Sequence, residues 1–71
     1  MIFLKTLKIT TEYITLQQFL KIENFISSGG EAKYYLQEND VYVNNELETR
    51  RGRKLYPNYI IVVENQEFKI I

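Results

Sequence analysis

The spacing of the apolar residues changes once along the 71-residue chain, close to Asn39. Before Asn39, apolar side chains recur at intervals of three and four residues, which predicts two short packed helices over residues 16–22 and 30–38. After Asn39 they alternate, which predicts a hairpin over residues 41–47 followed by further short strands. We therefore expect an α+β fold in which the two helices precede a small antiparallel sheet, with an extra N-terminal strand over residues 2–9.

Polar residues at fixed spacings indicate where these elements start and turn. Thr15 is followed three residues later by Gln18, and Ser28 by Glu31, and this spacing predicts a capping box at the start of each helix. The pair Asn44-Asn45 tolerates the positive φ angles of a tight turn, which suits the predicted hairpin.

The predicted core combines the apolar faces of the helices and strands. Residues 60–63 form a β-branched run, which is typical of a strand buried on both faces. The residues expected in the core are Phe19, Leu20, Phe25, Leu36, Val41, Val43, Leu47, Ile60 and Val62.

The chain contains neither Cys nor His. The absence of Cys excludes disulfides and thiolate metal sites, and the absence of His removes the commonest general base and zinc ligand. A chain this short also buries only about 60% of its unfolded surface, which argues against a deep substrate cavity. We therefore expect a single domain over residues 1–71 that is not an enzyme and takes no cofactor, no metal ion and no small-molecule substrate.

The sequence predicts no membrane or export segment. Its longest apolar run, residues 59–63, is far shorter than the roughly 20 residues that span a bilayer. Lys5 interrupts the N-terminal apolar residues before the apolar region of a signal peptide can form. We expect a cytoplasmic protein without a membrane partner, and the oligomeric state is left open.

Positive charge is concentrated in one segment, the basic block Arg50–Lys54. This block holds four of the nine basic residues, so the remainder of the chain has five basic residues against nine acidic ones and a net charge of minus four. Such a distribution favours a polyanionic partner at one place on the surface, although a merely solvated loop would look similar. Arginine matches phosphate oxygens with two parallel hydrogen bonds, and Gly52 lets a strand approach the backbone closely, so we expect the arginines to project outward and contact nucleic acid.

Other polar residues have both a structural and a functional interpretation. Lys33 flanks the apolar stripe of the second helix, where a lysine is commonly only a solvated charge. Ser28 is a helix cap at a helix start whose free N–H groups also favour phosphate. Tyr56, next to the basic block, can stack on an unpaired base or pack at the edge of the core. Glu46 and Glu48 are expected on the same side of an exposed strand, where they offer no catalytic pair.

Four segments between Thr15 and Val63 follow one another in a characteristic order, namely Ser27–Lys33, Val41–Asn45, Arg50–Lys54 and Leu55–Ile60. In this order the chain resembles the S-four RNA-binding domain, the module named after small-subunit ribosomal protein four, and in particular its stand-alone YaaA-like branch. That family combines two short helices, a hairpin with Val-Asn-Gly, a basic stretch, a Pro-Gly-Asp turn and a strand.

The resemblance implies an α-L fold and RNA bound along the second helix and the loop after the hairpin. Here Gly29 stands where many family members have Arg, which shifts the expected contacts toward the basic block. The implied partner is structured RNA, specifically ribosomal RNA or an assembling ribosomal particle, with ribosomal proteins nearby. The candidate RNA contacts are Arg50, Arg51, Arg53, Lys54, Lys33, Ser28, Asn44 and Tyr56.

A second interpretation belongs to a different class of protein. The chain would be a protein-interaction module in which the basic block meets an acidic surface and a free strand edge, in residues 2–9 or 68–71, pairs with a partner.

Overall fold

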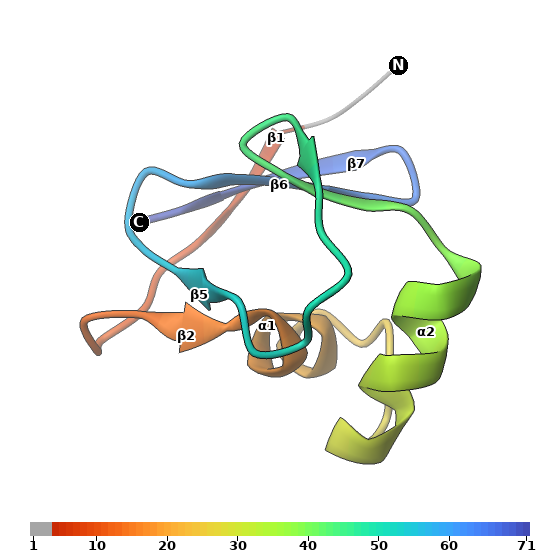
Figure 1. Ribbon diagram of the computed structural model, residues 1–71. Helices are drawn as coiled ribbons and strands as arrows, with labels where there is room; N and C mark the ends of the chain where they lie inside the picture. Colours follow the sequence, from red (N-terminus) through yellow and green to blue (C-terminus); the bar gives the residue numbers. More distant parts are fainter. Residues whose placement is uncertain (1–3) are drawn as a thin grey trace.

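The computed structural model describes residues 4–71 as two helices packed on one side of a five-stranded sheet (Figure 1). Residues 2 and 3 of the predicted N-terminal strand lie outside the described residues. In chain order the elements are β1 (Leu4–Leu7), β2 (Ile14–Thr15), α1 (Leu16–Ile22), the 3-10 turn η1 (Gly29–Glu31), α2 (Ala32–Glu38), β3 (Val41–Val43), β4 (Glu46–Leu47), β5 (Lys54–Leu55), β6 (Ile60–Val63) and β7 (Gln66–Ile70). The predicted α+β class is confirmed.

The five strands of the main sheet lie in the order β1-β7-β6-β3-β4, and β2 and β5 form a separate two-stranded sheet. All pairings are antiparallel except that of β1 with β7, which is parallel. The N-terminal strand is therefore an edge strand. The prediction of a free edge at residues 68–71 is wrong for Phe68 to Ile70, because β7 is paired with β1 on one side and with β6 on the other.

The start of α1 is the predicted capping box. The Thr15 hydroxyl accepts a hydrogen bond from the Gln18 amide at 3.2 Å, and the Gln18 side chain accepts one from the Thr15 amide at 2.8 Å. Two N–H groups at the helix start are thus satisfied locally, which explains why the predicted and observed bounds of this helix agree.

The start of α2 differs from the prediction. Residues Gly29–Glu31 form a 3-10 turn, the α-helix begins only at Ala32, and Ser28 makes no capping hydrogen bond with its side chain. The Glu31 carboxylate instead accepts a hydrogen bond from the Ser27 hydroxyl, which holds the pKa of Glu31 below its usual value. The second predicted capping box is therefore wrong, because the donor to Glu31 comes from one residue earlier in the chain.

Side chains from α2 also fix this helix against the sheet. The Tyr35 hydroxyl donates a hydrogen bond to Glu64 in the turn between β6 and β7. Burial and the neighbouring Glu64 carboxylate together raise the pKa of the Tyr35 phenol above its ordinary value. The backbone of that turn has positive φ at Glu64 and Asn65, as the predicted turn at Asn44-Asn45 does.

The core lies between the helices and the covered face of the main sheet. Phe68 of β7 meets Phe19 edge to face, with the ring centroids 5.1 Å apart. Phe25 is half-buried and packs against the same ring at 5.9 Å. The buried apolar residues are Ile14, Leu16, Phe19, Leu20, Ile26, Ala32, Leu36, Val41, Val43, Leu55, Ile61, Val63, Phe68 and Ile70.

Three residues predicted in the core do not belong to it. Ile61 and Val63 are fully buried, whereas Ile60 and Val62 are only half-buried, so β6 is buried on one face and not on both. Leu47, at the outer edge of the sheet, is 56% exposed. The reason is that both helices cover the same face of the sheet (Figure 1). Within residues 4–71, no helix has the length and apolar character needed to cross a membrane.

Candidate nucleic-acid interface

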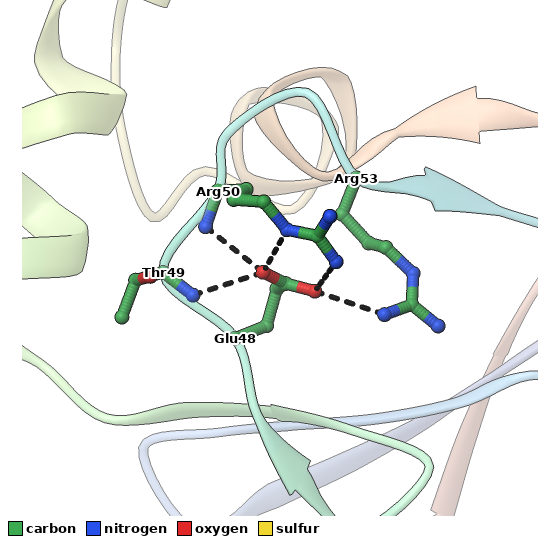
Figure 2. Close-up of polar contacts among 4 residues, drawn as sticks. All are labelled: Glu48, Thr49, Arg50 and Arg53. Carbon is green, nitrogen blue, oxygen red and sulfur yellow. Dashed lines mark hydrogen bonds and ion pairs between the residues drawn. The ribbon is translucent and has the colours of Figure 1, made fainter.

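The basic block is folded around the carboxylate of Glu48 (Figure 2). Glu48 Oε2 accepts hydrogen bonds from the backbone amides of Thr49 at 3.1 Å and Arg50 at 3.0 Å. The Arg50 guanidinium binds both carboxylate oxygens, through Nε to Oε2 at 3.0 Å and through Nη2 to Oε1 at 3.1 Å. Arg53 Nη1 adds a contact to Oε1 at 2.9 Å. A single carboxylate therefore organises the whole turn between β4 and β5.

The environment of Glu48 keeps this carboxylate ionised. The residue is only 5% exposed. Hydrogen bonds from Arg50, opposed by burial and supported by Arg53, lower the pKa of Glu48 to about 2. The prediction of an exposed Glu48 on the same strand as Glu46 is wrong, because β4 ends at Leu47 and the chain then turns inward.

The start of α1 holds the other side of the basic block. The amide of Leu16 donates to the carbonyl of Arg53 at 2.8 Å, and the amide of Gln17 donates to the carbonyl of Arg51 at 2.9 Å. The first N–H groups of a helix have no acceptor within the helix, so these carbonyls supply partners that α1 needs. Lys54 is also paired with Thr15 in the small sheet. The backbone of the block is thus fixed at both ends, and Figure 1 shows this segment descending from the main sheet to α1.

The sequence predicted that the arginines of the block project outward, but not all of its side chains do so. Arg50 pairs with Glu48 but its side chain remains 71% exposed. Arg53 pairs with Glu48, is only 24% exposed and lies over the Tyr59 ring, 5.8 Å from the ring centroid. The expectation of an outward guanidinium is therefore wrong for Arg53. Arg51 and Lys54 are exposed and form no ion pair with any of the residues described here.

Lys33 of α2 faces the basic block across an open hollow of about 590 Å³, which we call the α2 hollow. The hollow brings one lysine of the second helix together with exposed arginines of the block, as the family resemblance implied. The residues lining it are Lys33, Gln37, Thr49, Arg50, Arg51 and Gly52. A larger hollow of about 660 Å³, between the β1–β2 connection and α1, is lined mainly by uncharged side chains and lacks such a cluster of cations.

A second hollow of about 540 Å³ lies on the other side of the block, and we call it the tyrosine hollow. Its lining residues are Arg50, Gly52, Arg53, Lys54, Tyr56 and Tyr59. Tyr56 thus lies beside the block as predicted. Tyr59 was not singled out from the sequence, although the turn at Pro57-Asn58, closed by the hydrogen bond from the Tyr59 amide to the Tyr56 carbonyl at 3.1 Å, brings the two rings together.

Two candidate contacts lie outside both hollows. Ser28 is exposed just before η1. Asn44 lies in the hairpin turn and bonds to Ile60. Its side-chain oxygen accepts a hydrogen bond from the Ile60 backbone N–H at 2.9 Å, and its backbone N–H donates to the Ile60 carbonyl at 2.8 Å. Across residues 4–71, the acidic residues form no group of three that could hold a metal ion.

Comparison with known proteins identifies the protein family to which this chain belongs. Residues 7–71 match the family model of the S4 domain, which is the S-four module, and the chain belongs to this family. The match extends beyond residues 15–63 to include Leu7, the last residue of β1, and all of β7. The chain is also similar to the "Probable ribosome maturation protein RlbA" of Bacillus subtilis (strain 168), with 52% identity over 58 residues that cover 82% of each protein. The family membership predicted from the sequence is confirmed.

Proposed function

We propose that this protein binds structured RNA, either ribosomal RNA or an assembling ribosomal particle, through the basic block and α2. The observation that carries the proposal is the α2 hollow, in which Lys33 and the exposed Arg50 and Arg51 face one another. Family membership and the name of the Bacillus relative support a role in ribosome maturation. The α-L arrangement that the family resemblance implies would present α2 and the block on one continuous surface.

The mechanism is neutralisation of phosphate charge by a surface that is ordered before RNA arrives. Glu48 and the start of α1 fix the backbone of the block, so little conformational entropy is lost on binding. Four cations are exposed enough to meet phosphates, namely Lys33, Arg50, Arg51 and Lys54. In this proposal Arg53 stabilises the loop through its ion pair with Glu48. RNA contact by Ser28 and Asn44 stays a prediction, and the mechanism does not use it.

The dependence of RNA affinity on salt tests this mechanism. Four phosphate contacts predict that log K falls against log salt with a slope of about −2.8 for single strands to about −3.6 for a duplex, because each contact releases bound counterions. Fluorescence anisotropy with labelled fragments of ribosomal RNA at several salt concentrations measures this slope. A slope close to zero would contradict the proposal, since binding would then not depend on these charges.

A protein-interaction module remains the second candidate function. It is favoured by the position of β1 at the edge of the main sheet, where no other strand within residues 4–71 pairs with its outer side. Purification from cells separates the two functions. Excess absorbance at 260 nm that disappears after ribonuclease treatment supports RNA binding. A stoichiometric protein partner that survives ribonuclease supports the alternative.

A further inference from the structure

The tyrosine hollow adds an aromatic surface to one side of the basic block. The Tyr56 ring lies between two others, with its centroid 5.6 Å from that of Tyr13 and 5.6 Å from that of Tyr59. The rings are tilted by 49° and 60° rather than stacked flat. Tyr13 comes from the residue before β2 and Tyr56 from the residue after β5, so the small sheet holds them together.

Cations are held against this aromatic surface. Lys54 Nζ lies 4.9 Å from the centroid of Tyr13, and the Arg53 guanidinium lies over Tyr59. None of the described residues that line the hollow is acidic, but Glu48 pairs with Arg50 and Arg53 and leaves Lys54 as the lining cation outside these ion pairs. Aromatic rings beside such a lysine suit a ligand that has both a flat face and a negative charge.

The hydroxyls of the two tyrosines that line the hollow, Tyr56 and Tyr59, can meet such a ligand. Among the residues that the structure describes, neither hydroxyl forms a hydrogen bond. No buried side-chain oxygen in the described chain lacks a hydrogen-bond partner, so these hydroxyls reach water.

We propose that the tyrosine hollow holds one unpaired nucleotide of the bound RNA, an inference that rests on the proposed function. The base lies against Tyr56 and Tyr59, and the phosphate lies on Lys54. A base inside a duplex has both faces covered by its neighbours, so only an unpaired base can take this place. The two hollows share Arg50 and Gly52, and a Cβ atom built at Gly52 would meet nothing within 4 Å. A strand can therefore cross the block at Gly52, from paired RNA along the α2 hollow to the unpaired nucleotide beyond it. The RNA class preferred by the protein is a duplex with an adjacent unpaired nucleotide.

Two RNA hairpins of equal length test this inference, one with an uninterrupted stem and one with a single bulged 2-aminopurine. The wild-type protein should bind the bulged hairpin at least fivefold more tightly, since stacking on an aromatic side chain contributes about 1 to 3 kcal/mol per base. The fluorescence of 2-aminopurine should change when its base moves onto the tyrosines. Tyr56→Leu should remove most of the preference for the bulge, while Tyr56→Phe should keep it because the ring remains.

Matched variants separate this inference from the proposed function. Arg51→Ala should weaken binding to both hairpins by the same factor, because Arg51 lines only the α2 hollow. Tyr34→Leu, an exposed ring on α2, should leave the preference unchanged. Equal affinity of the wild-type protein for the two hairpins would overturn the inference and leave the proposed function in place. The same conclusion would follow if Tyr56→Leu weakened binding to both hairpins by an equal factor and Tyr56→Phe weakened it as much. Failure to bind either hairpin in a salt-dependent way would overturn both.

Discussion

Replacing Lys33, Arg51 and Lys54 together by Ala should weaken binding to structured RNA by about 10- to 100-fold at low salt and reduce the salt slope by about 2 to 3. These three residues are exposed and take no part in the hydrogen bonds around Glu48 through their side chains. The scaffold of the loop should therefore survive the substitutions, and only contacts with phosphate are removed. Anisotropy titrations across a salt series, with thermal unfolding to verify the fold, measure the effect.

A control of equal charge is available on the same chain. Lys5, Lys8 and Lys21 are exposed and lie outside both hollows beside the block. Replacing them by Ala lowers the net charge by the same amount, so the long-range field changes similarly. We expect this control to retain most of the affinity and nearly the full slope. An equal loss in both triple variants would show that total charge, not the proposed surface, governs binding.

Replacing Glu48 by Gln should lower the free energy of unfolding by about 2 to 3 kcal/mol at neutral pH. The pKa of Glu48 is lowered from 4.5 to about 2, which at about 1.4 kcal/mol per pKa unit sets an upper limit of about 3.5 kcal/mol, and the Gln amide keeps part of the hydrogen bonding. The Gln side-chain amide has nearly the same size as the carboxylate but presents no charge to Arg50 and Arg53. Its NH2 group is a donor at a position where a carboxylate oxygen accepted hydrogen bonds. Urea unfolding measures the loss. Glu46→Gln, on the exposed strand β4, is the matched control and should change stability by less than about 0.5 kcal/mol.

The same pair of proteins makes a prediction about pH. The pKa of Glu48 is lowered from 4.5 to about 2 in the folded protein, so its ionised form contributes stability above the unfolded value and loses that contribution as pH falls toward the folded one. The difference in stability between wild type and Glu48→Gln should therefore shrink between pH 4.5 and pH 2. A difference that stays constant across this window would show that Glu48 does not titrate with the lowered pKa.

The Glu48→Gln variant also separates charge from geometry in RNA binding. The substitution makes the segment from residue 48 to Lys54 more positive by one charge, which by itself would strengthen binding. We expect weaker binding instead, because Arg50 and the loop amides lose the group that positions them. Tighter binding, measured in the same anisotropy assay, would show that a preformed loop is not needed.

The parts of the fold that follow from local signals were predictable from the sequence. The capping box of Thr15 and Gln18 and the positive φ angles at Asn44-Asn45 depend on neighbouring residues alone. The phase of β6 was not predictable, because four β-branched residues in a row contain no polar residue to indicate which side faces water.

The candidate site shows the same division between local and tertiary information. The basic block and Lys33 could be read from charge and family resemblance. The inward turn of Glu48 could not, although an acidic residue two positions before one arginine and five before another is compatible with it in retrospect. The aromatic cluster depends on pairing between β2 and β5, which are distant in the chain, so Tyr13 and Tyr59 gave no signal of their own.

The hydrogen bonds between α1 and the basic block link the dynamics of the two. Because the amides of Leu16 and Gln17 donate to carbonyls of Arg53 and Arg51, the block cannot peel away without fraying the first turn of a helix whose next residues lie in the core. Loop opening and helix fraying then form one cooperative fluctuation. A polyanion bound to the block should slow deuterium uptake at the amides of Leu16 and Gln17. The exchange rates of these two amides, which face the protein and not the ligand, would therefore report whether the block is occupied.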